Sequence, residues 1–185
     1  MQQRTMRLCD WGGVLVTRKL GERVRQEIAS QLHGGNEPES IILDCSGLQI
    51  MDYSCADELV ARLAIEMQNR LYGDRFLLLD SLDATIHENI EVALKQRSIA
   101  VQCLIQQGRP VLQLLGELRP YLESALTMLN ERRELTARDL ADSEGLAINT
   151  ASNRLTELAK NGLAYRRSDS VATGGKQFQY LSIQP

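Results

Sequence analysis

The residues of this sequence that are best placed to do chemistry surround Ser54, which stands at the start of a predicted helix. A serine there can accept a hydrogen bond from a backbone N–H two or three residues on, and losing such a helix cap costs about 1 kcal/mol. The same position could instead carry a phosphate, because a helix N-terminus offers free N–H groups and the positive end of the helix dipole. The charges of Asp57 and Glu58, in the first turn, would repel that phosphate. A structural cap and a regulatory phosphosite are therefore both open for Ser54.

Two aspartates near the same loop, Asp44 and Asp52, could bind a metal ion or do acid–base work. No histidine or further type of ligand gathers beside them in the sequence. Aspartates at the ends of strands more commonly bond to nearby backbone amides, and we expect this of both residues. The sequence therefore predicts no metal site and no cofactor.

Little else in the chain favours catalysis. His33 and His87 are isolated, without a serine or cysteine partner at the spacing of a catalytic triad. The phosphate-binding patterns GxxxxGK[ST] and GxGxxG and the hydrolase pattern GxSxG do not occur in the sequence. An enzyme is thus the poorest of the functional hypotheses, and we expect a protein that acts by binding.

Composition narrows the class of protein further. The 185 residues are 43% hydrophobic and 24% charged, which is ordinary for a globular chain, and 4% aromatic, which disfavours a platform for single-stranded nucleic acid. The four cysteines form no CxxC pair, so neither a zinc site nor a disulfide framework is indicated. No signal segment is evident, and no apolar run approaches the roughly 20 residues that span a bilayer. We expect a cytoplasmic protein that does not bind membranes.

Charge is unevenly placed along the chain. The net charge is −3, residues 1–116 hold 12 basic and 15 acidic side chains, and residues 117–185 hold nine of each. Neither half has the positive balance of an obvious nucleic-acid binder. Any contact with DNA must therefore come from a local patch.

The first half of the chain alternates strand-like and helix-like segments. Apolar periodicity and turn residues predict the following order: a strand over 12–17, a helix ending at His33, a strand over 41–45, a helix over 55–71, a strand over 76–80, and a helix capped by Asp83. Residues 100–116 suggest a hairpin or a strand leading into a linker. This alternation is typical of an α/β fold, a sheet with helices packed on it.

The part of this half that surrounds Ser54 resembles the STAS-like family, relatives of bacterial anti-sigma-factor antagonists. The resemblance covers roughly residues 12–105 and is carried by the strand ILDCSG, the spacer LQIMD and the helix start YSCADEL. In the antagonists the matching loop reads Asp-Ser-Ser-Gly, and a partner kinase that is also the anti-sigma factor phosphorylates its second serine. The resemblance thus implies a phosphoacceptor at Ser54 and a partner loop, as we call the residues Asp52, Tyr53, Ser54 and Cys55. Tyr53 and Cys55 replace the first serine and the glycine.

The second half, about residues 117–182, is similar to the winged helix-turn-helix domain of bacterial transcription regulators. Its stretch ELTARDLADSEGLAINTASNRLTELAKNGLAYRR has the order of helix, turn, second helix and first wing strand, with Thr136 as a helix cap. In such a domain the start of the second helix enters the major groove of DNA. The residues expected at DNA are Asn149, Thr150, Ser152, Asn153, Arg154, Lys160, Arg166, Arg167 and Lys176.

Together these patterns predict a STAS-like domain at 1–116 and a winged helix-turn-helix domain at 117–185. The leading hypothesis is a bacterial regulator whose first domain senses a partner or a modification and whose second domain binds double-stranded DNA. With about five cations in the patch, tight binding would need a homodimer. The alternative is a phosphorylation-switched adaptor whose winged helix binds protein, with a kinase-type ATPase as partner.

Overall fold

The chain folds into two compact units, Met1–Glu117 and Leu118–Gln184. The computed structural model describes residues 1–34, 37–107, 109–170 and 176–184. Each unit is considered by itself below.

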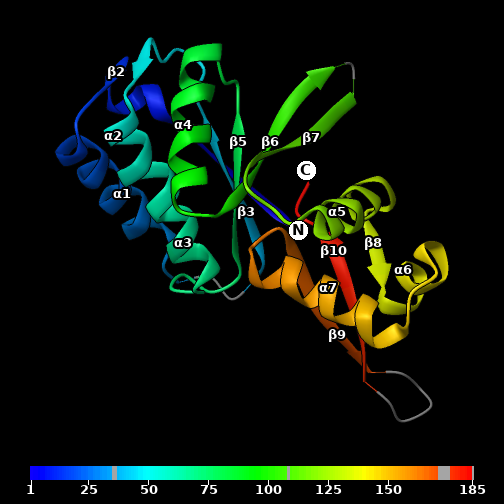
Figure 1. Ribbon diagram of the computed structural model, residues 1–185. Helices are drawn as coiled ribbons and strands as arrows, with labels where there is room; N and C mark the ends of the chain where they lie inside the picture. Colours follow the sequence, from blue (N-terminus) through cyan, green and yellow to red (C-terminus); the bar gives the residue numbers. More distant parts are fainter. Residues whose placement is uncertain (35–36, 108, 171–175, 185) are drawn as a thin grey trace. The chain divides into compact units, whose positions relative to one another are not determined.

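Unit 1 is built on a five-stranded sheet (Figure 1). The strands, in their order across the sheet, are β1 (Gln2–Arg7), β3 (Glu39–Asp44), β5 (Arg75–Asp80), β6 (Ala100–Gln107) and β7 (Arg109–Gly116). The first four are parallel, and β7 runs antiparallel to β6. The apolar runs of β3 and β5 are buried along almost their whole length, which is why they lack the alternation of a half-exposed strand.

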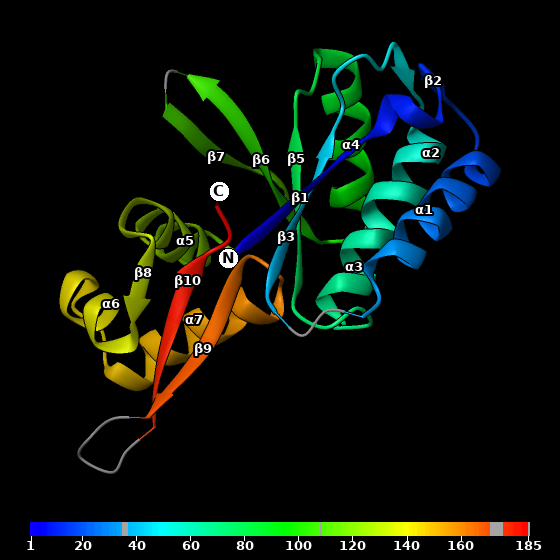
Figure 2. The same ribbon diagram turned by 180° about the vertical axis from the view of Figure 1, so that it is seen from behind.

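The helices of unit 1 all cover the same face of this sheet, as Figures 1 and 2 both show. They are α1 (Arg18–Leu32), a continuous helix made of α2 (Tyr53–Ala56), the π-helical η2 (Asp57–Ala61) and α3 (Arg62–Gln68), and α4 (Ala84–Gln96). The short segments η1 (Leu8–Trp11), β2 (Val14–Leu15) and β4 (Ile50–Met51) complete the unit. Leucine, isoleucine and valine side chains of the helices and of alternate strand positions form one core between the two layers.

Most elements expected in this half are present, with four differences. The strand expected over 12–17 is only the two-residue β2, and the N-terminal strand β1 was not expected. Residues 100–107 and 109–116 pair as the antiparallel strands β6 and β7, so the hairpin alternative is present and the strand leading into a linker is not. The helix expected over 55–71 starts two residues earlier, at Tyr53, and ends three residues earlier, at Gln68.

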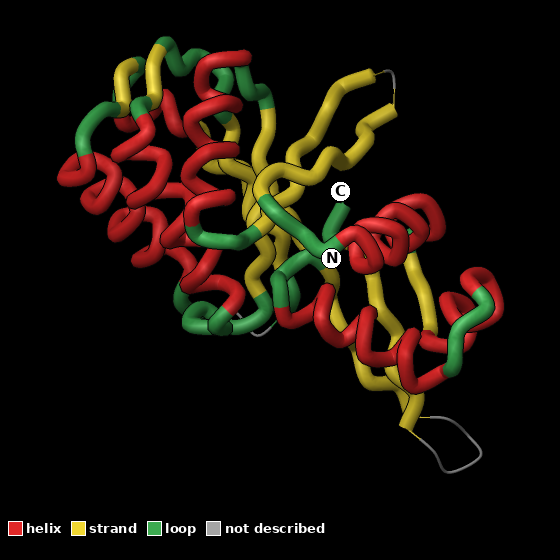
Figure 3. The backbone as a smooth tube through the Cα atoms, viewed as in Figure 1, coloured by secondary structure: helices red, strands yellow, loops and turns green. Residues whose placement is uncertain are grey.

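Over residues 118–170 and 176–184, unit 2 contains three helices and a three-stranded antiparallel sheet (Figure 3). In chain order the elements are α5 (Pro120–Arg132), β8 (Glu134–Thr136), α6 (Ala137–Glu144), α7 (Ile148–Lys160), β9 (Ala164–Ser170) and β10 (Lys176–Ser182), and the strand order is β8-β10-β9. The core of unit 2 includes the buried side chains of Leu126, Leu140, Leu155 and Tyr180.

Local signals set the helix boundaries of unit 2. Pro120 occupies the first turn of α5, where its missing N–H costs nothing. Thr136 and Asp139 form a reciprocal capping box at the start of α6, which confirms Thr136 as the cap. Gly145 ends α6 with a φ of 65°, a left-handed conformation that glycine adopts without strain. A turn of two more residues then leads into α7.

Candidate functional sites

The helix that carries the partner loop is capped by Asp52 and not by Ser54. One carboxylate oxygen of Asp52 accepts a hydrogen bond from the N–H of Cys55 at 2.7 Å, and the other accepts one from the N–H of Thr17 at 3.0 Å. Ser54 is the second residue of α2, so the interpretation of Ser54 as the cap is wrong. Asp52 therefore orders two helix starts, because Thr17 is itself the N-cap of α1.

The other three residues of the partner loop have different surroundings. Cys55 is buried in the core, and burial raises the pKa of its thiol to about 12, so it is a poor nucleophile at neutral pH. The hydroxyl of Tyr53 donates a hydrogen bond to Gln96 of α4. Ser54 is half-buried, and its hydroxyl makes no hydrogen bond within the described part of the chain. Ser54 is thus the loop residue with an uncommitted hydroxyl.

Asp44 also behaves as a strand-end aspartate. Its two carboxylate oxygens accept hydrogen bonds from the N–H and the hydroxyl of Ser46, both at 2.8 Å. The expectation that Asp44 and Asp52 bond to nearby backbone amides is confirmed. Over residues 1–34, 37–107, 109–170 and 176–184, no three His, Cys, Asp or Glu side chains gather in a way that could hold a metal ion.

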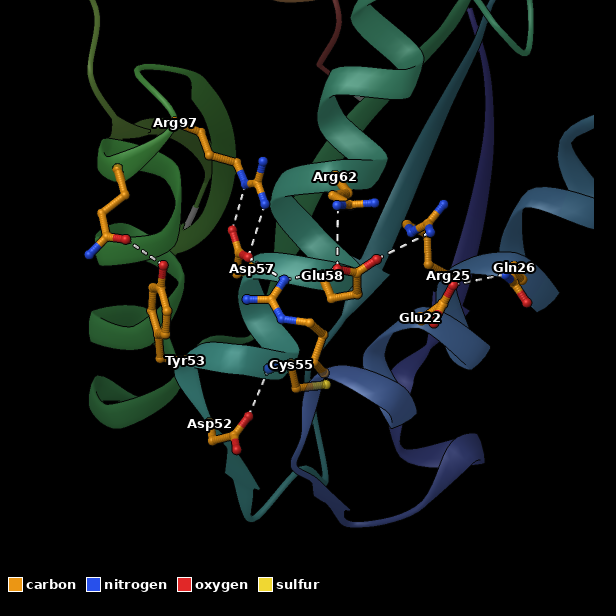
Figure 4. A network of polar contacts seen from close by, with 12 residues as sticks. Glu22, Arg25, Gln26, Asp52, Tyr53, Cys55, Asp57, Glu58, Arg62 and Arg97 are labelled. Atoms are coloured by element: carbon orange, nitrogen blue, oxygen red, sulfur yellow. Dashed lines mark hydrogen bonds and ion pairs between the residues drawn. The ribbon is translucent and has the colours of Figure 1, made fainter.

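Directly after the partner loop, two buried carboxylates meet four arginines (Figure 4). Asp57 and Glu58 are 4% and 3% exposed and lie in the π-helical turn η2. Asp57 is paired with Arg97 through two hydrogen bonds, of 2.5 and 2.9 Å, and with Arg18 at 2.8 Å. Single π-helical turns inside α-helices are often found at functional sites.

Glu58 has three of these partners. Arg18 lies 3.0 Å from its carboxylate, and Arg25 and Arg62 each lie 3.3 Å from it. Arg25 also pairs with Glu66, whose other oxygen accepts a hydrogen bond from the hydroxyl of Tyr72. The network therefore ties α1 and α4 to the helix that starts at Tyr53.

This network offsets the charges of Asp57 and Glu58, which would otherwise repel a phosphate on Ser54. The cluster holds four guanidinium groups, those of Arg18, Arg25, Arg62 and Arg97, and three carboxylates, those of Asp57, Glu58 and Glu66. Its formal charge is therefore +1, and the carboxylates that would repel a phosphate are already paired. The side chain of Arg18 remains 53% exposed.

Asp57 is expected to make the protein less stable in acid. The bonds from Arg97, with a further contribution from Arg18, hold the pKa of the Asp57 carboxyl below its ordinary value of 3.8. As the pH falls, the unfolded chain binds this proton first. The ion-paired Asp57 carboxylate therefore makes its full contribution to the free energy of unfolding well above pH 3.8. That contribution is lost as the pH falls through the lowered pKa of Asp57.

The measurement is urea denaturation between about pH 7 and pH 3, followed by the fluorescence of Trp11, for the wild type and Asp57→Asn. The difference in the free energy of unfolding between the two should be constant above about pH 5 and should shrink below it. A difference that stays constant down to pH 3 would contradict the assignment.

In unit 2, the start of α7 presents the polar residues that the sequence analysis singled out. Asn149, Thr150 and Asn153 are exposed, and Ser152 is half-buried. Ile148, the first residue of α7, is 51% exposed, which is unusual for an isoleucine. Lys160 is exposed at the other end of the helix.

Arg154 is placed differently from these residues. Its guanidinium pairs with Glu144 of α6 at 2.5 Å and lies 5.2 Å from the ring centroid of Tyr121 of α5. Glu144 also accepts a hydrogen bond from the hydroxyl of Ser124. Arg154 therefore joins α7 to the two other helices, and replacing it would disturb the fold as well as any contact with DNA.

Arg166 and Arg167 of strand β9 lie on the exposed surface of the β9–β10 pair. The guanidinium of Arg166 stacks on the ring of Phe178 with 3.6 Å to the centroid, and Arg167 donates a hydrogen bond to Gln179. Both arginines are exposed. Lys176 begins β10, and its side chain lies outside the described part of the structure.

A pocket of about 450 Å³ opens between the starts of α6 and α7 and strand β10. It brings together Ile148, Asn149 and Ser152 with a residue that sequence reasoning missed, the exposed Arg138. Arg138 is the second residue of α6, where the helix dipole disfavours a cation. The sequence did carry a signal for Arg138. It is a cation in the first turn of a helix, where it does not stabilise the helix.

Comparison with known proteins assigns no family: no protein-family model matches the chain, and no curated protein matches it. None of the helices in the described residues has the length and apolar character needed to cross a membrane. Evidence on function therefore comes from the residues of the two sites.

Proposed function

We propose that this chain is a bacterial cytoplasmic transcription regulator in which unit 2 is a winged helix-turn-helix that binds double-stranded DNA. Unit 1 is a STAS-like domain that receives the signal through the partner loop. The observation that carries the proposal is the exposed, polar start of α7, which follows α6 after a glycine turn and stands beside the antiparallel β9–β10 pair. The function needs no catalytic group.

The chemistry of the exposed side chains supports DNA as the ligand. Asparagine can make paired hydrogen bonds to a base edge, and exposed Arg138, Arg166, Arg167 and Lys160 can neutralise phosphates. Unit 2 as a whole is close to neutral, with nine basic and eight acidic residues over 118–184. Four phosphate contacts from one protomer would therefore give only modest affinity. The regulator is therefore proposed to bind DNA as a homodimer, as two protomers double the contacts.

The second candidate function is an adaptor switched by phosphorylation of Ser54. The specific observation in its favour is the uncommitted hydroxyl of Ser54 beside a cluster whose carboxylates are already paired with arginines. A kinase-type ATPase is the proposed partner, and unit 2 would then bind protein. The two candidates differ in whether DNA is bound at all.

The test is retention of the purified full chain on a pool of fragments from its own genome at two salt concentrations. The wild type should enrich one repeated site. The logarithm of its affinity should fall linearly with the logarithm of the salt concentration, with a slope no steeper than about −7, because a dimer offers eight cations. The double variant Asn149→Ala/Asn153→Ala should lose specific binding about 30-fold or more, because each of the two paired contacts discriminates by about 1–3 kcal/mol.

Asn69→Ala is the matched control, because Asn69 is an exposed asparagine of unit 1. It should bind as the wild type does. Lack of retention at low salt would refute the DNA-binding proposal. If a protein partner then co-purified and depended on Ser54, the adaptor would be the better candidate.

A further inference from the structure

The start of α7 offers an unusual set of side chains to a DNA groove. Ile148, Asn149, Thr150 and Asn153 are its exposed residues before the last turn. Helix α7 contains only two cations, Arg154 and Lys160. Lys160 is the final residue of the helix, about 18 Å along the axis from Ile148 at 1.5 Å per residue. It lies too far from the start of the helix to contact the same bases.

Arg154 is not available to read a base either. Its side chain is only 20% exposed, pairs with Glu144 at 2.5 Å and lies over the ring of Tyr121. Glu144 is itself 16% exposed and is held by Ser124. To reach a base edge, Arg154 would have to leave this carboxylate partly buried without its partner, which is unfavourable.

The chemistry of base recognition then selects one kind of base pair. Guanine is read mainly by paired bonds from arginine or lysine to its O6 and N7 atoms. Adenine is read by paired bonds from asparagine or glutamine, and the thymine methyl group is read by apolar side chains. The exposed start of α7 has two asparagines and an isoleucine but no available cation.

We propose that unit 2 selects A·T base pairs at the positions that the start of α7 contacts. In this arrangement Asn149 and Asn153 bond to adenine edges, and Ile148 packs on a thymine methyl group. Arg138 at the start of α6 contacts the phosphate backbone beside them, across the pocket that the two helix starts share. This inference rests on the proposed DNA-binding function and specifies its target.

The experiment starts with selection of duplexes from a random library by the full-length protein. The selected half-site should contain A·T pairs at its core, and replacing one of them by G·C should weaken binding by about 5- to 150-fold. Two modified duplexes then probe single atoms of the selected site. Uracil in place of thymine removes the methyl group, and 7-deazaadenine in place of adenine removes N7.

Each modified duplex has a matching protein variant. Uracil should weaken wild-type binding about three- to fivefold, as expected for one buried methyl group, and should not weaken binding further in Ile148→Ala. Deazaadenine should weaken the wild type about tenfold, and the Asn149→Ala/Asn153→Ala variant should be insensitive to it. Arg132→Ala, at the exposed end of α5, is the control and should keep both sensitivities.

The outcomes separate the inference from the proposed function. Salt-dependent, specific binding to a core of G·C pairs would overturn the A·T assignment and leave the DNA-binding function standing. Binding without any sequence preference, or an Ile148→Ala variant as sensitive to uracil as the wild type, would also overturn it. No retention of DNA at low salt would overturn both.

Discussion

Replacing Glu58 by alanine is expected to lower the free energy of unfolding by about 3 kcal/mol, the lower end of the range for breaking a buried ion pair. Glu58 is 3% exposed and contacts Arg18, Arg25 and Arg62. Arg18 and Arg62 are about half-exposed and can turn to water, so most of the cost comes from Arg25, whose side chain is 10% exposed. In the variant, Arg25 would still be paired with Glu66, and this remaining ion pair limits the loss of stability to about 3 kcal/mol.

Urea denaturation followed by fluorescence measures this effect in unit 1, because Trp11 is the single tryptophan of the chain. Glu22→Ala is the control, as Glu22 is exposed on α1, and it should change stability by less than about 0.5 kcal/mol. The pair Arg25→Met/Glu58→Leu should recover much of the loss, because apolar replacements of a buried pair are often neutral. If Glu58→Ala were as stable as Glu22→Ala, the buried network would not stabilise the fold.

Replacing Gly116 by alanine should destabilise the protein by about 3 kcal/mol, from overpacking and from a strained backbone together. An added Cβ would stand 2.2 Å from the carbonyl oxygen of Ile99 and 2.9 Å from Cβ of Leu94, and φ is +91°. The backbone here cannot easily move, because the N–H of Gly116 donates a hydrogen bond to Glu91 and the carbonyl of Ile99 accepts one from Glu117.

A second glycine separates the two causes. Gly73 has a φ of +75°, and nothing lies within 4 Å of its added Cβ, so Gly73→Ala carries only the backbone strain. In the same fluorescence experiment it should cost about 1 kcal/mol. Equal losses in the two alanine variants would mean that the contact with Ile99 is relieved without cost.

The elements that the sequence predicted are those whose signals are local. The apolar runs of β3 and β5 and the cap of α4 at Asp83, whose side chain accepts from the N–H of Ile86, can be recognised from a few neighbouring residues. Strand β1 has no such signal. Only Met6 of its residues is buried, and the strand exists because its backbone pairs with β3, 37 residues away in register.

The candidate sites could be located from the sequence but not resolved. The partner loop lies at a helix start, as the sequence predicted. Whether Asp52 or Ser54 caps that helix depends on a distant segment, because the N–H of Thr17 donates a hydrogen bond to Asp52. The same limit applies to Arg154, because its partner Glu144 is 10 residues earlier and meets it only after α6 and α7 have packed. Arg138, in contrast, carried a local signal, a cation beside the positive end of a helix.

The π-helical turn η2 has a consequence for tracing the ancestry of this chain. A π turn accommodates one residue more than an α-helical turn of similar rise, so the face that the helix presents is rotated after Ala61 relative to an uninterrupted helix. Seven consecutive residues, Cys55 to Ala61, are buried across this phase change. A relative whose helix is regular throughout would lack one residue between 57 and 61. Its alignment with this chain would require a gap inside the helix, immediately beside the buried carboxylates.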